Sequence, residues 1–149
     1  TEVASYTFEA ITTSKGMVLN NIGSGSKYLG AYIDDEGNWL DGKNNYEIIV
    51  TKDAPANQFW SITIYDNDTR CIIQNEQGKS DISSVMENIK VEADGSTRIF
   101  VGEKAPEGYE NNWIQSNPNK GFFAYLRLYG PLESYYDKSW IMPNVKKVK

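Results

Sequence analysis

The fold class is decided by residues 59–65, which read FWSITIY. Successive side chains of a β-strand point to opposite faces of its sheet, so this alternation puts Trp60, Ile62 and Ile64 on one face. The other face receives an aromatic ring at each end and a hydroxyl residue at each position between them. The pattern predicts a strand with one aliphatic face in the core and one face of rings and hydroxyls.

Two more segments alternate in the same way, residues 28–33 (YLGAYI) and residues 122–129 (FFAYLRLY). In each, one face is mainly aliphatic, and the other carries rings and, at Arg127, one charge. If the three strands share a sheet, these second faces form one surface, termed the aromatic face. It comprises Tyr28, Gly30, Tyr32, Phe59, Ser61, Thr63, Tyr65, Phe123, Tyr125, Arg127 and Tyr129. Such a surface either packs beneath another part of a protein or binds a ligand.

Outward from these three segments, about eight strand-like runs are separated by short turns. The further runs are residues 46–51, 70–74, 89–93, 97–101 and 112–116. Asp94-Gly95 is typical of a two-residue hairpin turn. No helical stretch is long enough for a βαβ crossover, so the sequence predicts an all-β, antiparallel sandwich. Minor helical segments are expected near the termini, within residues 1–27 and at residues 132–138.

Length and composition limit the function. A chain of 149 residues makes one domain, taken here as residues 28–149 behind an N-terminal extension or linker remnant, residues 1–27. The net charge is −5, and the only basic cluster is the terminal run 146–149, so nucleic acid is not an expected partner. No apolar run reaches the roughly 20 residues of a membrane span.

The chain contains no histidine. This excludes Ser-His-Asp and Cys-His catalysis and histidine-ligated zinc, so any catalysis must use carboxylates, lysine, tyrosine or an oxygen-bound metal. The single cysteine, Cys71, lies in an apolar run and is predicted to be buried and inert.

An acidic stretch, residues 34–41, superficially resembles a calcium loop. The EF-hand pattern requires glycine at the sixth position, which Trp39 occupies if Asp34 is the first. We therefore expect an acidic hairpin turn here and no metal site.

One ordered set of segments occupies the last two thirds of the chain: residues 59–66, Thr69-Arg70, 94–96, 106–108 with Glu110, 112–114, 120–123, 127–131 and 137–140. In this order and spacing they resemble the family catalogued as domain of unknown function 1214. The resemblance covers most of residues 28–149 and implies a jelly-roll sandwich at the C-terminal end of longer, mostly bacterial proteins. It also implies a β-rich N-terminal domain as partner and a periplasmic, envelope or secreted location. No activity comes with it.

A saccharide or small anionic ligand fits the aromatic face and its neighbours best. Arg70 and Arg127 lie at or within predicted strands, where a buried arginine needs a carboxylate partner. Either the two arginines form structural ion pairs with nearby carboxylates, or they bind an anion. The candidate ligand-binding residues are Tyr65, Arg70, Trp113, Tyr125, Arg127 and Tyr129.

Three carboxylates, Glu110, Asp137 and Asp66, are candidates both for those ion pairs and for catalysis. Glycoside hydrolysis needs two carboxyl groups roughly 5–10 Å apart, and Glu110 near Trp113 could have a raised pKa. A carboxylate-based hydrolase is therefore the enzyme alternative, although the sequence favours a non-enzyme without a cofactor. A purely structural interaction module is the third hypothesis.

Overall fold

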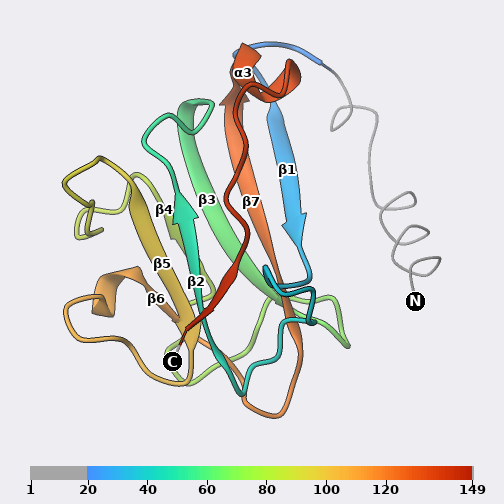
Figure 1. Ribbon diagram of the computed structural model, residues 1–149, viewed down its shortest axis with the longest axis vertical. Coiled ribbons are helices and arrows are strands. Elements are labelled where there is room, and N and C mark those ends of the chain that lie inside the picture. The colour runs from blue at the N-terminus through green and yellow to red at the C-terminus, as the bar shows by residue number, and fades with distance from the viewer. Residues whose placement is uncertain (1–19, 149) are drawn as a thin grey trace.

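The structure, a computed structural model, describes residues 20–148 and contains two four-stranded sheets (Figure 1). The described chain is an all-β sandwich, which confirms the predicted fold class, while the jelly-roll topology stays a prediction. The only helical elements of this part are the short helices η1 and α3. In chain order the elements are β1 (Ser26–Ala31), β2 (Asn45–Val50), β3 (Ala56–Asp66), β4 (Asp81–Ser83), β5 (Thr97–Gly102), η1 (Glu110–Asn112), β6 (Trp113–Gln115), β7 (Phe122–Pro131), α3 (Glu133–Tyr136) and β8 (Lys146–Val148).

The first sheet has the order β1-β7-β3-β4, and all its neighbouring strands are antiparallel. Leu126 of β7 lies opposite both Leu29 of β1 and Ile62 of β3. Ile62 and Ile64 are at most 1% exposed, so the predicted aliphatic face is the core face. Burial of each such side chain stabilises the fold by about 1.5–3 kcal/mol.

The second sheet has the order β6-β5-β2-β8. Tyr46, Ile48 and Val50 of β2 are buried in the core that it shares with the first sheet. β5 and β6 pair in parallel, whereas the other strand pairs described are antiparallel. The connection through residues 103–112 returns the chain to the end where β5 began, and this is why the mainly antiparallel arrangement that the sequence predicts contains one parallel pair.

Two predicted strands are wrong, and two others were missed. Residues 70–74 make a single bridge, from Ile72 to Tyr65, and residues 89–93 form no strand. In the latter segment the backbone bonds to a side chain at the end of η1, since the Lys90 amide donates to the Asn112 side chain at 2.8 Å. The three-residue strands β4 and β8 were missed because so short a run shows little alternation.

Two local predictions have opposite outcomes. Cys71 is exposed, not buried as predicted, because it lies in the turn after β3 and its apolar neighbour Ile72 is also 46% exposed. The acidic hairpin is confirmed, since Ile33 bridges to Trp39 and the Asp34 carboxylate accepts hydrogen bonds from the Asn38 and Glu36 amides at 2.8 and 3.1 Å.

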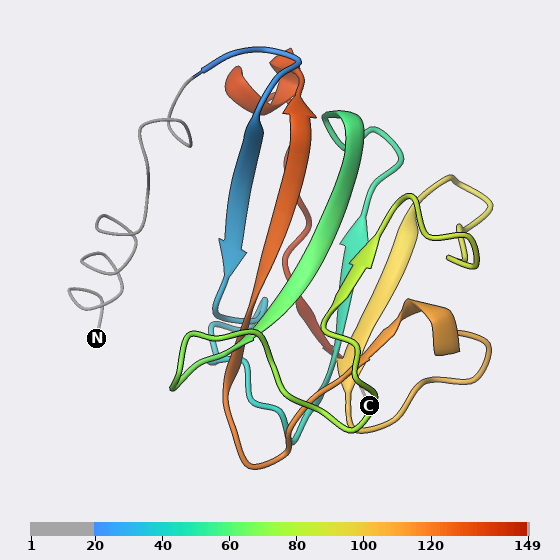
Figure 2. The same cartoon turned by 180° about the vertical axis from the view of Figure 1, so that it is seen from behind.

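The chain after β7 forms α3, as predicted for residues 132–138, and then descends beside the sandwich to pair as β8 with β2. Figures 1 and 2 both show this C-terminal segment running along the gap between the two sheets. No helix within residues 20–148 is long and apolar enough to cross a membrane. The helix expected within residues 1–27 falls mainly on residues 1–19, outside the described part of the chain.

Candidate functional site

The aromatic face is the outer face of the first sheet. The strand register places its residues in rows across the sheet, with Arg127 of β7 between Tyr28 of β1 and Ser61 of β3. In the next row, Tyr125 lies between Gly30 and Thr63. The three separate sequence segments therefore do meet on one surface.

The rings of this face pack on one another. Phe123 is stacked against both Tyr32 and Tyr65, with ring centroids 5.2 Å apart in each pair, and is only 1% exposed. Tyr125 meets these rings edge-on, and its hydroxyl lies 2.9 Å from that of Tyr32. Aromatic pairs across strands stabilise a sheet, so much of this face is held rigid by its own contacts.

Gly30 makes room for one of these rings. A Cβ atom at this position would lie 2.8 Å from Cε1 of Tyr125 and 3.0 Å from the ring of Tyr32. The tyrosine therefore leans over the bare backbone of β1, which a larger residue would prevent.

Arg127 lies among tyrosines. Its Nη2 donates a hydrogen bond to the Tyr65 hydroxyl, and its guanidinium carbon is 5.7 Å from the ring centroid of Tyr28. Its Nε atom is buried and has no hydrogen-bond partner. Within residues 20–148, no carboxylate makes a salt bridge to Arg127, so the structural ion pair, one of the two alternatives for this arginine, is not formed there.

The pKa of Arg127 is nevertheless raised. Burial, the largest influence, lowers it, but the hydrogen bond with Tyr129 and the electrostatic interactions with Tyr65, Tyr129 and Tyr28 outweigh burial. The side chain is thus a permanent cation held among tyrosine side chains.

Arg70 and Tyr129 extend the site along the sheet in opposite directions. The guanidinium carbon of Arg70, in the turn after β3, lies 5.2 Å from the ring centroid of Phe123. Its backbone is left-handed, with φ of 59°, which is uncommon for a residue other than glycine. At the other end Tyr129 stacks on Phe59 with centroids 4.1 Å apart.

Five of the six candidate ligand-binding residues lie on or beside this face, and the sixth, Trp113, lies elsewhere. Trp113 begins β6 in the second sheet, where its indole Nε1 donates to the Gly102 carbonyl at 3.0 Å. Tyr28, Tyr32 and Phe123 were left out of the candidate set, although the alternation of residues 28–33 and 122–129 placed them on the same surface.

The three candidate carboxylates lie apart. Asp66 ends β3 opposite Phe122, at the start of β7, and forms an ion pair with Lys120 at 2.6 Å. Asp137 follows α3, beyond the other end of β7, so roughly 30 Å of strand separates the two. Glu110 is exposed in η1, beside the second sheet. The geometry brings no two of them together as a catalytic pair.

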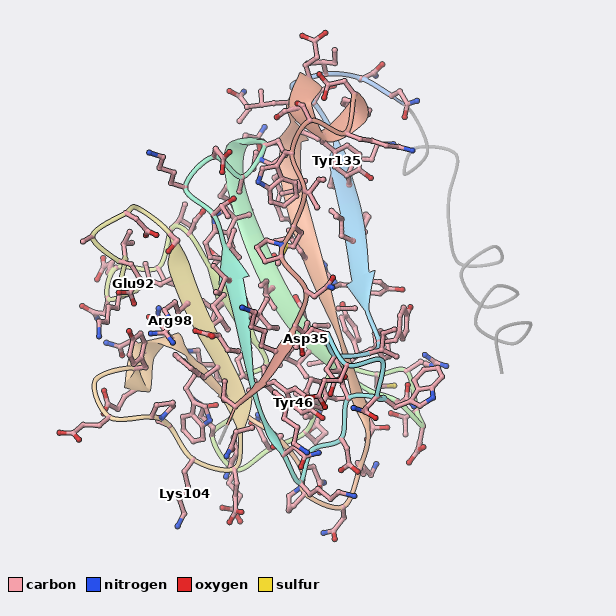
Figure 3. All side chains as sticks on the ribbon, viewed as in Figure 1. Asp35, Tyr46, Glu92, Arg98, Lys104 and Tyr135 are labelled. Carbon is pink, nitrogen blue, oxygen red and sulfur yellow. The ribbon has the colours of Figure 1, made fainter. Side chains whose placement is uncertain are left out.

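The second sheet carries a different charged cluster on its outer face, which the sequence reasoning missed. Arg98 of β5 forms an ion pair with Glu47 of β2, and its Nη1 donates to the Tyr109 hydroxyl at 3.2 Å. That hydroxyl donates in turn to Glu92 at 2.6 Å. Figure 3 shows Arg98 and Glu92 on the same side of the molecule. The hydrogen bond to Glu47 is the main cause of the raised pKa of Arg98.

Comparisons with known proteins give one family match and two solved structures, and none of them names an activity. A crystal structure of the VPA0106 protein from Vibrio parahaemolyticus has 29% sequence identity and a TM-score of 0.71 over 83% of this chain. A structure of an uncharacterised protein from Burkholderia cenocepacia has 14% identity and a TM-score of 0.49 over 85% of this chain. The chain spans only 31% of the length of each. A search of curated proteins gives no significant match.

Residues 25–133 match the family described as "Protein of unknown function (DUF1214)". This interval begins one residue before β1 and ends at the start of α3, so it contains seven of the eight strands described. The chain therefore belongs to the DUF1214 family.

Proposed function

We propose that the aromatic face binds a small anionic ligand, and that a saccharide bearing a carboxylate is the best-fitting class. The single observation that supports this is the environment of Arg127, a cation surrounded by phenols without a carboxylate partner among residues 20–148. A guanidinium in such surroundings can accept a carboxylate as its counter-ion.

The surrounding rings fit the rest of such a ligand. Tyr65, Tyr125 and Tyr129 are half-buried, so each keeps part of its surface in contact with solvent. An aromatic ring with a hydroxyl offers both an apolar surface for a sugar ring and a hydrogen-bonding group for its substituents. Because the rings are packed on one another, little side-chain entropy is lost on binding.

Titration with sodium glucuronate and with glucose, followed by amide and side-chain NMR shifts, tests the proposal. We expect glucuronate to shift the resonances of Tyr65, Tyr125 and Arg127 saturably, and glucose to bind at least tenfold more weakly. Arg127→Met should weaken glucuronate binding by at least tenfold.

Lys104→Met is the matched control because it removes one positive charge from an exposed loop beside the second sheet (Figure 3). It should leave glucuronate binding unchanged. Equal loss in both variants would mean nonspecific charge attraction, and the absence of saturable shifts with either sugar would overturn the proposal.

A second candidate function is docking of another domain against the aromatic face. The observation that favours it is length, since the chain spans 31% of the Vibrio protein, which leaves most of that protein free to pack against this region. Analytical ultracentrifugation tests it. Self-association that Tyr125→Glu abolishes would favour a docking face, whereas a strictly monomeric chain would count against it.

A further inference from the structure

A cavity of about 400 Å³ lies between the two sheets, on the side where β1 and the C-terminal segment meet. Its walls come from both sheets, and residues 142–145 cover its outer side. It adjoins the aromatic face at Gly30 and Tyr32, but the aliphatic side chains that line it belong to the opposite face of the first sheet. The aliphatic wall residues from the strands are Leu29, Ala31, Ile48, Ile62, Ala124 and Leu126.

Two alanines account for the space. Ala31 of β1 lies directly opposite Ala124 of β7 on the core face. In the preceding row the same positions hold Leu29 and Leu126. Replacing two leucines by two methyl groups at the end of these strands leaves a volume that no neighbouring side chain fills.

The C-terminal segment forms the outer wall without closing it completely. The Val145 carbonyl accepts a hydrogen bond from the Asp35 amide at 2.8 Å, and the Val145 side chain is 4% exposed, so this end is anchored. Asn144 is exposed, and Ile33, which also lines the cavity, is 48% exposed. Ile33 bridges to Trp39, which is 61% exposed, so an apolar edge leads to the opening.

The lining chemistry restricts the ligand. No charged side chain lines this cavity, and apart from Gly30, Tyr32 and Asn144 its lining residues are aliphatic, methionine or proline. Apolar cavities of about 150 Å³ bind benzene, and ligand pockets commonly measure about 300–1,000 Å³. We propose that the cavity binds the aliphatic chain of a small amphiphile, such as a fatty alcohol or fatty acid, with its polar end beside Asn144 at the opening.

Decan-1-ol is the probe, followed by methyl NMR shifts of Ala31 and Ala124 and by the shift in Tm. Binding should be saturable and should raise Tm, because a ligand that binds only the folded state stabilises it. Decanoate, which has the same chain with a charged end, should shift the same two methyl groups.

Ala31→Leu together with Ala124→Leu fills the cavity and should weaken decan-1-ol binding by at least tenfold. If this double variant does not fold, Ala124→Val, which fills a smaller part of the cavity, should still weaken decan-1-ol binding severalfold. Met142→Ala has the opposite effect on the cavity: it removes part of the outer wall and enlarges the cavity. The preferred alcohol should then have a longer chain.

Tyr129→Ala on the aromatic face is the control and should leave decan-1-ol binding unchanged, which also separates this site from the anion site. Two outcomes would overturn the proposal. One is no saturable shift at Ala31 and Ala124 with either probe, and the other is undiminished binding in a filled variant that remains folded.

Discussion

Each sheet of the sandwich carries an arginine on its outer face, and the two arginines have opposite surroundings. Arg98 of the second sheet is joined to the Glu47 carboxylate and, through Tyr109, to Glu92. Arg127 of the first sheet is held by a tyrosine hydroxyl and by aromatic rings. The charge of Arg98 is therefore balanced by carboxylates of its own cluster, whereas the positive charge of Arg127 is not.

The difference separates a structural charge from a functional one. The Glu47 side chain is only 9% exposed, so this carboxylate needs the guanidinium of Arg98 for stability. No buried carboxylate depends on Arg127 in the same way, since none forms a salt bridge with it within residues 20–148. We expect Arg98 to matter mainly for folding and Arg127 mainly for binding.

The largest effect is expected from Arg98→Met, which leaves the Glu47 carboxylate buried without its cation. Loss of a buried partner costs about 3–5 kcal/mol, but Arg98 is 38% exposed, so solvent screening reduces the expected loss to about 2 kcal/mol. Arg127→Met should lower the free energy of unfolding by less than about 1 kcal/mol. Urea denaturation of both variants measures the contrast, and equal losses would remove the distinction between the two arginines.

The tyrosine hydroxyls provide the next test. Tyr109→Phe removes the group that joins Arg98 to Glu92, and should cost about 1.5 kcal/mol of unfolding free energy. Tyr65→Phe removes one acceptor from Arg127 and should cost about 1 kcal/mol. Thermal unfolding compares the two, and a larger loss from Tyr65→Phe would mean that the Arg127 cluster is the more structural of the two.

The strands that build the aromatic face could be predicted because their alternation spans six or more residues. Residues 59–65 and 122–129 alternate over their full length, and the structure extends both into longer strands. β4 and β8 were not predicted because each is three residues long and depends on pairing with a distant strand. Residues 89–93 look like a strand, but the Asn112 side chain bonds to both the amide and the carbonyl of Lys90, and the sequence gives no sign of that contact.

Side-chain partners were less predictable than faces. Alternation assigned Arg127 to the correct surface but could not indicate that Tyr65, rather than a carboxylate, would be its partner. Asp66 was a plausible partner until the register placed it beside Lys120. The Arg98 cluster was missed because it joins β2, β5 and the loop before η1, whose proximity follows only from the strand order. The cavity likewise depends on a register that sets Ala31 opposite Ala124.

The ion pair of Asp66 and Lys120 allows the pH dependence of stability to be tested separately from ligand binding, because it lies at the end of β3 and not on the aromatic face. Burial, the largest influence, raises the pKa of Asp66, but the bond from Lys120 and the amides of Thr69 and Asp68 together bring it below its ordinary value of 3.8. A depressed folded-state pKa contributes stability above the unfolded-state value, and this is lost as pH falls through the folded-state value.

Asp66→Asn should therefore lower unfolding free energy by about 1 kcal/mol at pH 6 and flatten its decline below about pH 4. Denaturant titrations at pH 6 and pH 3 measure both effects. Glucuronate binding at pH 6 should be unaffected, and a large loss of binding would mean that Asp66 belongs to the ligand site after all.

The smallest change in stability is expected from a variant that gives Arg127 a carboxylate partner, as Arg98 already has. Ser61 lies directly opposite Arg127 and is 6% exposed, so Ser61→Asp supplies the carboxylate that this face lacks. The cost of burying the new charge and its attraction to Arg127 should nearly cancel, leaving a change within about 0.5 kcal/mol.

Unlike stability, ligand binding should change strongly in Ser61→Asp. The new carboxylate pairs with the Arg127 guanidinium in place of the ligand, so glucuronate affinity should fall at least tenfold. Thr63→Asp is the matched control. It places the same charge one row away, opposite Asp81 of β4, where repulsion and burial without a cation should cost more than about 1 kcal/mol. If Ser61→Asp proves as costly as Thr63→Asp, Arg127 does not act as a free counter-ion. The stability of this pair of variants therefore tests the availability of the charge separately from any choice of ligand.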